Sequence, residues 1–451
     1  MRIADLAGRR VAVWGYGREG RAAVWALRSR LPELSFGVFC SAAESADVGA
    51  RARAITSPPD AASLSAFDVV IKSPGISAYR PEILEAQHNG TLFTSGTALW
   101  FAQHPEARVI AVTGTKGKST VSALIAHGLR ALGQRTALAG NIGLPLLELL
   151  DPPRVPETWV VELSSFQTRA APSVEVGVIN NLYEEHLDWH GTRERYAADK
   201  LALAGAAQTL IVNALQRDLL ARTAAHPRRV VFGETGGWHL RDGAIFRASQ
   251  RAFEIADLPL PGAHNALNVC AALAAIEAAG ADAMTALRAM RTFRPLPHRL
   301  QTLGERDGVR WIDDSIATTP QATLEALASL PTGDVTVLAG GYERGLDWQP
   351  FAEQVQRTPP RAIVTMGANG ARIAGVLRET PGKYRLESTA TLDEAVSTAR
   401  RITARGGILL LSPGAPSFDQ FRDYAERGRA FATLGGFDTA TLGEIGGLGI
   451  A

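Results

Sequence analysis

Short runs of β-branched and aromatic residues alternate with Ala-, Leu- and Arg-rich segments along nearly the whole chain. The Ala-, Leu- and Arg-rich segments predict amphipathic helices, for example at 20–31, 119–132 and 265–279. Strands connected through helices pair in parallel, so we expect an α/β protein. The β-rich runs predict buried strands at 11–14, 35–39, 69–71, 109–113, 159–163, 176–180, 209–212, 309–313, 335–339, 362–366 and 407–411.

Two changes in this pattern suggest how the chain is divided. Residues 230–255 change to short strands with Gly turns, which predicts an antiparallel addition. Residues 293–298 read Phe-Arg-Pro-Leu-Pro-His, which is typical of a linker. At ~150 residues per domain, the length suggests about three domains. We predict a Rossmann-like N-terminal domain at 1–103, a central α/β domain at 104–297 and a Rossmann-like C-terminal domain at 298–451.

The composition excludes several classes of protein. Hydrophobic residues make up 46% and charged residues 20%, which rules out a disordered chain. A formal net charge of +2 argues against a nucleic-acid partner. Two cysteines, Cys40 and Cys270, are too few for a disulfide framework. No apolar run approaches the roughly 18–20 residues of a membrane helix, and the charged N-terminus does not resemble a signal peptide. We therefore expect a cytoplasmic protein without a membrane partner.

A first glycine-rich loop follows the predicted strand 11–14. It reads Gly15-Tyr16-Gly17-Arg18-Glu19-Gly20, a GxGxxG pattern that lets a backbone approach a diphosphate at a helix N-terminus. A nicotinamide site also needs an acid about 20 residues further on, where this chain has Cys40-Ser41. Another nucleotide diphosphate, such as a UDP group, fits as well. Ser73 and Gly75, after the strand 69–71, could add backbone donors to it, although a structural turn would read the same.

A second glycine-rich loop lies between the strand 109–113 and a predicted helix. It reads Gly114-Thr115-Lys116-Gly117-Lys118-Ser119-Thr120, the strand–loop–helix context of a P-loop. Its N–H groups would hold phosphates, Lys118 would neutralise their charge, and the Ser119 hydroxyl would bind Mg²⁺. Val112 stands where the general P-loop pattern has its first glycine.

Further motifs follow the phosphate loop along the chain. With that loop, the segments are TGTKGKST at 113–120, GNIG at 140–143, VELSSFQ at 161–167, NNLYEEHLD at 180–188, PGAHN at 261–265, LPHR at 296–299, WIDDS at 311–315 and LSP at 411–413. Through these segments the chain resembles the ATP-dependent Mur ligases along essentially its whole length. Within this family, it looks most like members that add glutamate to UDP-N-acetylmuramoyl-L-alanine in peptidoglycan synthesis. In these enzymes, ATP phosphorylates the substrate carboxylate and an amine then attacks the acyl phosphate.

The resemblance implies roles for individual residues. Lys118, His186 and Lys200 would be catalytic. Mg²⁺ would be held by Ser119, Glu162, His186 and Lys200, the last as a carbamate, although a solvated helix lysine is the plainer interpretation of Lys200. ATP would be bound by residues 114–120 with Asn265, Arg299 and Asp314, the last two after closure of the C-terminal domain. The nucleotide substrate would be bound by Gly15, Gly17, Arg18, Ser41, Ser73, Gly75, Asn141, Ser164 and Gln167.

The C-terminal domain departs from the family pattern where the incoming amino acid binds. Enzymes that add D-glutamate usually read D-S-K-A-T, whereas this chain has Ile316 in place of the lysine. Arg344 replaces a second lysine, Ser417 is kept, and Tyr424 replaces a usual Phe. Ile316 cannot pair with a carboxylate, whereas Arg344 can do so with a different reach. We expect L-glutamate to be preferred, with an epimerase acting afterwards; D-glutamate or another amino acid are the alternatives.

Three other functions remain as alternatives. A folylpolyglutamate synthetase shares the P-loop type, but the N-terminal GxGxxG segment and the ELSSFQ stretch argue against it. An NAD(P) oxidoreductase lacks its acid near Cys40. A transport or nucleic-acid ATPase conflicts with the balanced charge. We also expect a monomer.

Overall fold

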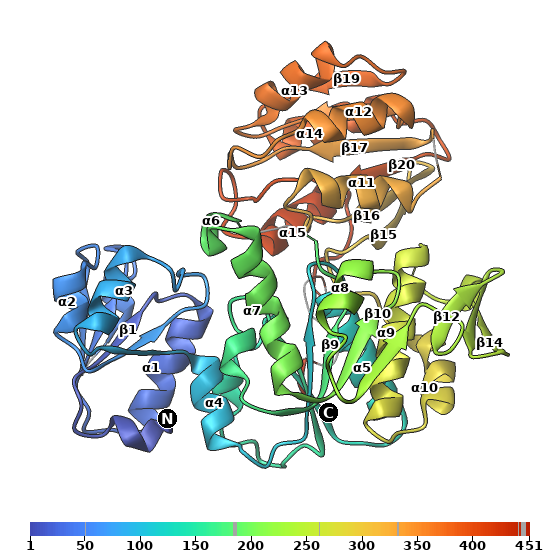
Figure 1. Ribbon diagram of the computed structural model, residues 1–451. Coiled ribbons are helices and arrows are strands. Elements are labelled where there is room, and N and C mark those ends of the chain that lie inside the picture. Colours follow the sequence, from blue (N-terminus) through green and yellow to red (C-terminus); the bar gives the residue numbers. More distant parts are fainter. Residues whose placement is uncertain (50, 184–186, 261, 332, 441, 443–447) are drawn as a thin grey trace. The chain divides into compact units, whose positions relative to one another are not determined.

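The computed structural model describes residues 1–49, 51–183, 187–260, 262–331, 333–440, 442 and 448–451. The fold is α/β, with three mainly parallel sheets, as predicted (Figure 1). The chain forms two compact units. The first comprises Met1–Leu258, His264–Phe293 and the strand at the C-terminus, and the second comprises Pro259–Ala263 and Arg294–Gly446.

The N-terminal part of the first unit is a five-stranded parallel sheet in the order β3-β2-β1-β4-β5. Because β1 lies between β2 and β4, the strand order reverses there, and ligands bind at such a switch point outside the carboxyl ends of the strands. The elements are β1 Val11–Trp14, β2 Phe36–Phe39, β3 Ala52–Ile55, β4 Val69–Lys72, β5 Leu92–Thr94, α1 Arg18–Arg30, α2 Ala61–Ser65, α3 Pro81–His88 and α4 Gly96–Gln103.

The rest of the first unit is built on a seven-stranded sheet in the order β11-β10-β9-β6-β8-β7-β21, parallel except for β21. β6 is a central strand that carries the predicted P-loop at its carboxyl end. The elements are β6 Val109–Thr113, β7 Thr136–Gly140, β8 Thr158–Glu162, β9 Val174–Ile179, β10 Ala207–Asn213, β11 Arg229–Phe232, β21 Gly449–Ile450, α5 Lys118–Ala131, α6 Leu187–His190, α7 Arg193–Ala206, α8 Arg217–Arg222, α9 Ala263–Ala278 and α10 Ala283–Ala289.

A small antiparallel sheet follows in the chain, as residues 230–255 predicted. It consists of β12 Trp238–Arg241, β13 Ala244–Arg247 and β14 Gln250–Glu254. Among the described helices, none has both the length and the apolar run that crossing a bilayer requires.

The second unit is a six-stranded sheet in the order β15-β16-β20-β17-β18-β19, parallel except for β15. The carboxyl ends of β16, β20 and β17 therefore lie next to one another. The elements are β15 Gln301–Arg306, β16 Val309–Asp313, β17 Val335–Ala339, β18 Ala362–Thr365, β19 Arg385–Ser388, β20 Ile408–Leu411, α11 Pro320–Ala328, α12 Gln349–Arg357, α13 Gly370–Glu379, α14 Leu392–Ile402 and α15 Tyr424–Leu434.

Local sequence explains where many helices begin. The side chains of Ser95, Thr192 and Thr391 each accept a hydrogen bond from the N–H three residues later, at the starts of α4, α7 and α14. The same cap at α15 is supplied by Asp423. These caps satisfy donors that a helix N-terminus otherwise leaves without partners.

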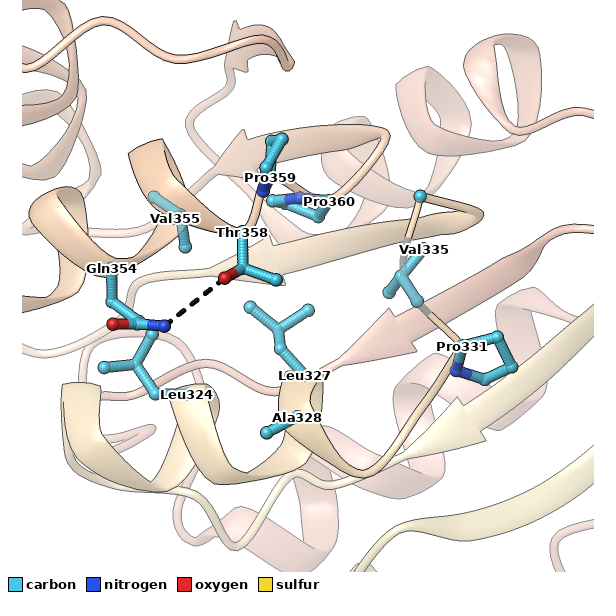
Figure 2. Close-up of a pocket in the computed structure, with 11 residues that line it drawn as sticks. Leu324, Leu327, Ala328, Pro331, Val335, Gln354, Val355, Thr358, Pro359 and Pro360 are labelled. Carbon is cyan, nitrogen blue, oxygen red and sulfur yellow. Dashed lines mark hydrogen bonds between the residues drawn. The ribbon is translucent and has the colours of Figure 1, made fainter.

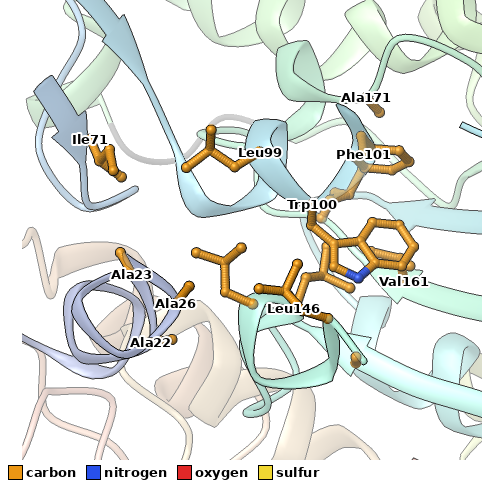
Figure 3. Close-up of a cluster of buried hydrophobic side chains, with 14 of the residues drawn as sticks. Ala22, Ala23, Ala26, Ile71, Leu99, Trp100, Phe101, Leu146, Val161 and Ala171 are labelled. Atoms are coloured by element: carbon orange, nitrogen blue, oxygen red, sulfur yellow. The ribbon is translucent and has the colours of Figure 1, made fainter. Parts of the chain in front are cut away.

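The five-stranded and seven-stranded sheets of the first unit share one apolar core. Figure 3 shows this core, in which alanines of α1 lie in one cluster with Leu99 and Trp100 of α4 and with Leu146, which follows β7. Trp100 is fully buried, and its ring packs edge-on against Trp159 of β8 with centroids 4.7 Å apart. A shared core explains why residues on both sides of position 104 form one compact unit. The domain boundaries at 103 and 297 stay a prediction.

Replacing Trp100 with Ala should destabilise the first unit by about 3–5 kcal/mol, because it leaves a large cavity in the shared core. Urea unfolding followed by circular dichroism would measure the loss. Trp25→Ala is the matched control, since Trp25 is 51% exposed on α1 and should change stability by no more than about 0.5 kcal/mol. Equal effects of the two substitutions would contradict the shared core.

Candidate active site

The loop between β6 and α5 has, at two glycines, a backbone conformation that other residues rarely adopt. Gly114 has φ +151° and Gly117 has φ +77°. A Cβ at Gly117 would lie 2.5 Å from Asn268 Oδ1 and 2.7 Å from Asn180 Nδ2. The loop is held from outside as well, because the Lys116 N–H donates to Asn181 Oδ1 at 2.7 Å. This rigid loop leads into the N-terminus of α5, the arrangement that binds phosphate.

The side chains of the loop and of the neighbouring α9 make contacts within the protein. Lys118 Nζ donates to the Thr115 carbonyl at 3.1 Å, and Thr115 Oγ1 lies 2.7 Å from the Tyr196 hydroxyl of α7. Thr120 is buried, whereas Ser119 is half-buried in the first turn of α5. Asn265 of α9 is connected to the loop through neighbouring amides: Asn268 Nδ2 donates to Asn265 Oδ1 at 3.4 Å, and Asn180 Nδ2 donates to Asn268 Oδ1 at 2.9 Å.

Glu162 ends β8 directly beside the strand that carries the loop. The strand register pairs it with Val112. Its side chain is buried, and Oε1 accepts a hydrogen bond from Asn141 Nδ2 at 2.9 Å. Oε2 is buried and has no hydrogen-bond partner among the described residues. A buried carboxylate oxygen without a partner is costly, so a cation fits this position. Oxygen donors such as Glu162 and Ser119 are the ligands that Mg²⁺ prefers.

The fit to a metal rests on these oxygen donors and not on a ready-made cluster. Within the described ranges, no group of three or more His, Cys, Asp or Glu side chains is arranged to hold a metal ion. The predicted ligand His186 lies outside the described residues.

Lys200 is not a solvated helix lysine. It is only 2% exposed on α7, and its Nζ donates to the Gly114 carbonyl at 2.7 Å. The amine also lies 5.0 Å from the centroid of the Tyr196 ring. The structure therefore brings the predicted Lys200 to the phosphate loop.

A buried polar network around Asp199 lies beside Lys200 and was not predicted from the sequence. Asp199 is 2% exposed and accepts hydrogen bonds from the Tyr79 hydroxyl at 2.8 and 2.9 Å and from His190 Nδ1 at 2.8 Å. Arg169 forms an ion pair with the same carboxylate. His190 Nε2 lies 3.0 Å from Ser165 Oγ. Tyr79 comes from the loop region after β4, so the network joins the N-terminal sheet to the helix that carries Lys200.

The first glycine loop meets the loop after β4, as expected for adjacent strands. Ser73 Oγ donates to the Gly15 carbonyl at 3.1 Å, and a Cβ at Gly15 would lie 2.8 Å from that hydroxyl. Gly17 caps α1 and Gly75 has open space around it. Arg18 Nη1 reaches the Gly143 carbonyl at 3.4 Å, which links this loop to residues 140–143.

Three predicted substrate residues are engaged within the protein. Ser41 is exposed, and its hydroxyl donates to Glu44 at 2.7 Å. Ser164 Oγ donates to Gln167 Oε1 at 2.7 Å, and Gln167 Nε2 donates to Thr97 Oγ1 at 3.1 Å. Ser164 and Gln167 are buried, so they shape the loop after β8.

Lys72 lies at the end of β4, and no role for its side chain was predicted from the sequence. Its Nζ donates to the Ile76 carbonyl at 2.7 Å and lies 5.5 Å from the centroid of the Trp189 ring. Burial lowers the pKa of this amine to about 8. Neither this amine nor the Asp199 network has a sequence signal that separates it from an ordinary surface residue.

In the second unit, Asp314 follows β16 and is 6% exposed. Its carboxylate accepts hydrogen bonds from Ser412 Oγ at 2.7 Å and from the Leu300 N–H at 3.2 Å. Burial raises its pKa to about 7, although the charge of Arg299 opposes the shift. The preceding Asp313 pairs with His298 Nδ1 at 2.6 Å.

The predicted amino-acid residues lie in loops at the carboxyl edge of this sheet. Ile316 is half-buried after β16 and supplies no charge. Ser417, after β20, is 2% exposed, and its hydroxyl has no hydrogen-bond partner among the described residues. Arg344 is exposed in the segment after β17, and Tyr424 begins α15.

A small apolar pocket lies elsewhere on the second unit, between α11 and α12 (Figure 2). Leu324, Leu327 and Val355 line it, and Gln354 Nε2 donates to Thr358 Oγ1 at 3.4 Å. Its described lining includes no predicted site residue, so it is not part of the candidate site.

The rigid glycine loop on a central parallel strand defines a P-loop nucleotide-binding protein. The chain matches the family model of the Mur ligase middle domain over residues 112–276 and that of the Mur ligase glutamate ligase domain over residues 298–415. It belongs to the Mur ligase family, which is ATP-dependent.

Sequence relatives cover the whole chain. It is 49% identical to a UDP-N-acetylmuramoyl-L-alanine–L-glutamate ligase from Xanthomonas axonopodis pv. citri, with 100% of both chains covered. It is 39% identical to a protein of the same name from Salinispora tropica, with 96% of this chain and 98% of the relative covered.

Solved structures share the fold at low identity. A UDP-N-acetylmuramate–alanine ligase from Thermotoga maritima matches with a TM-score of 0.62 at 20% identity, covering 94% of this chain and 98% of the other. A MurF ligase from Thermotoga maritima in complex with ADP matches with a TM-score of 0.57 at 16% identity, covering 89% and 95%.

The carboxyl group of Asp314 should titrate near pH 7, because burial favours its neutral form. The ¹³Cγ chemical shift of Asp314, followed across pH, measures this directly. The folded pKa lies above the unfolded one, so this group's contribution to stability is complete below pH 3.8 and is lost as pH rises through about 7. Titration near pH 4 would show that the carboxyl is solvated.

Proposed function

We propose that this protein joins glutamate to UDP-N-acetylmuramoyl-L-alanine, with ATP as the energy source, in peptidoglycan precursor synthesis. The relatives named for this reaction support the substrates. The observation that carries the chemistry is the loop at 114–120 with the buried Lys200 and Glu162 around it. An oxygen of the substrate carboxylate attacks the γ-phosphorus of ATP, and ADP leaves. The amine of glutamate then attacks the carbonyl carbon, loses a proton, and phosphate leaves.

Such chemistry depends mainly on positioning and charge neutralisation. The N–H groups of Gly114, Gly117 and the first turn of α5 hold the phosphates, and Lys118 neutralises them. Thr115 and Lys116 shape the loop, because their N–H groups donate to Asn181. Asn265, Arg299 and Asp314 complete ATP binding. Ser119 and Glu162, with His186 and Lys200, would hold Mg²⁺, which neutralises phosphate charge.

Lys200 serves best as a carbamate, because an anion and not an ammonium suits a cation site. Its burial against Gly114 supports this role, since the amine already lies at the phosphate loop. The diphosphate of the nucleotide substrate is held by Gly15, Gly17, Arg18, Ser73 and Gly75. Ser41, Asn141, Ser164 and Gln167 bind or shape the rest of that substrate site.

We propose L-glutamate as the incoming amino acid, bound by Arg344, Ser417 and Tyr424. The departure at Ile316 and the L-glutamate in the relatives' names support this isomer. An epimerase would then act on the product, and the enzyme would work as a cytoplasmic monomer. D-glutamate is the second candidate, because the sequence retains Ser417 and the order of the family motifs.

The purified protein should turn over L-glutamate faster than D-glutamate, since Ile316 removes a cation that the D-isomer's site normally uses. The rate of ADP release with UDP-N-acetylmuramoyl-L-alanine and each isomer separately would measure this preference.

Arg344→Ala should raise the KM for glutamate about 10-fold or more, because charge-assisted hydrogen bonds to the carboxylate are lost. The KM for ATP is the internal control and should stay within about twofold. In the unsubstituted protein, faster turnover of D-glutamate than of L-glutamate would overturn the isomer assignment.

Lys200→Ala should lower turnover by about 1,000-fold or more, because the anion beside the phosphate loop is lost. Added acetate should restore part of the activity by supplying a carboxylate in the vacated space. Lys383→Ala, which changes an exposed lysine of the second unit, should be fully active with and without acetate. A fully active Lys200→Ala protein would exclude a catalytic role for Lys200.

A further inference from the structure

Arg427 is a buried cation at the carboxyl edge of the second sheet. It lies in the first turns of α15 and is 1% exposed. None of the ion pairs among the described residues includes it, although the charges of Asp419 and Asp313 act on it. Burying a guanidinium without a directly paired carboxylate is expensive unless its N–H groups are otherwise used.

The guanidinium donates hydrogen bonds to residues of two loops. Nε donates to Ser315 Oγ at 3.1 Å and Nη2 donates to the Ser315 carbonyl at 2.9 Å. Nη2 also donates to the Ala415 carbonyl at 2.9 Å, and Nη1 donates to the Pro416 carbonyl at 3.2 Å. Ser315 follows β16, whereas Ala415 and Pro416 follow β20. Arg427 therefore ties the loops of two adjacent strands together.

A third loop joins through the same carbonyl. The Tyr342 N–H, after β17, donates to the Pro416 carbonyl at 2.8 Å. A Cβ at Gly341 would lie 2.3 Å from that carbonyl oxygen and 3.0 Å from Arg427 Nη1. The three loops are therefore packed too closely around the guanidinium for a side chain at position 341.

Each contact of Arg427 lies close to a residue of the proposed glutamate site. Ser315 precedes Ile316, and its hydroxyl also donates to the Tyr424 carbonyl at 2.8 Å. Pro416 precedes Ser417, whose buried hydroxyl has no partner among the described residues. Tyr342 lies two residues before Arg344.

We propose that Arg427 is a positioning residue, which sets the affinity for the incoming amino acid by holding the loops after β16, β20 and β17 in register. The proposal rests on the proposed function. Four of the five N–H groups of Arg427 donate to the loop carbonyls and the Ser315 hydroxyl, so its role here is to hold the loops and not to bind the amino acid itself.

The test is Arg427→Lys in the full-length protein. Lysine keeps the charge but its single ammonium cannot span the two loops, whereas arginine presents a planar fork of donors. The KM for glutamate should rise about 10- to 100-fold, as expected when charged hydrogen bonds to the loops are lost. The KM values for ATP and for UDP-N-acetylmuramoyl-L-alanine should stay within about threefold of the wild type. Arg422→Lys is the control, because Arg422 is exposed in the same region and pairs only with Glu426 among the described residues.

Ser315→Ala covers the case in which Arg427→Lys does not fold. It removes the hydroxyl between Arg427 and Tyr424 but keeps the backbone carbonyl, so a rise of about 3- to 10-fold in the KM for glutamate is expected. A folded variant of either kind with an unchanged KM for glutamate, or with equal rises for all three substrates, would overturn the positioning role. Wild-type protein that fails to ligate glutamate would instead overturn the proposed function.

Discussion

The buried amine of Lys200 donates a hydrogen bond to the carbonyl of Gly114, and the site of the first unit is arranged around this contact. It ties α7 to the phosphate loop at a glycine whose φ of +151° other residues rarely adopt. Asp199, the neighbour of Lys200, is held by Tyr79 and His190. The hydrogen bonds of Asp199 therefore connect the loop after β4 to the helix that carries Lys200.

Much of this fold was predictable because buried parallel strands are short apolar runs. The strands at 11–14, 109–113, 309–313 and 335–339 have the predicted bounds. The strands β3, β5, β7, β15, β19 and β21 were not predicted from the sequence. Of these, β3, β5, β15 and β19 are edge strands with partly exposed residues, so their composition resembles that of loops. The tail strand β21 has only two residues and depends on pairing with β7.

The candidate site was predictable where motifs follow strands. Glu162 and the loop at 114–117 lie together because β6 and β8 are neighbours. Asp199, His190 and Arg427 were not predictable, since a charged residue in a helix normally faces water. Their burial is decided by tertiary contacts with Tyr79, Ser165 and the loops after β16 and β20. Resemblance identified the residues with chemical roles, but not the residues that hold them in place.

The two units divide the proposed reaction. In the proposed function, the first unit holds most of the residues for the phosphates and the nucleotide substrate. The second holds those for the amino acid and adds Arg299 and Asp314 to the ATP set. Both use the carboxyl edge of a parallel sheet, where loops from neighbouring strands converge. This chain departs from the family pattern at the amino-acid loops, where Ile316 removes a positive charge and Arg344 keeps the charge of a lysine with a different reach.

The central claim is that ATP activates the substrate carboxylate at the phosphate loop. UDP-N-acetylmuramoyl-L-alanine carrying ¹⁸O in both oxygens of its alanine carboxylate tests this directly. If the acyl phosphate forms, the inorganic phosphate released with L-glutamate carries one ¹⁸O atom per turnover, which mass spectrometry detects. Phosphate without the label, in reactions that make the amide product, would contradict the account.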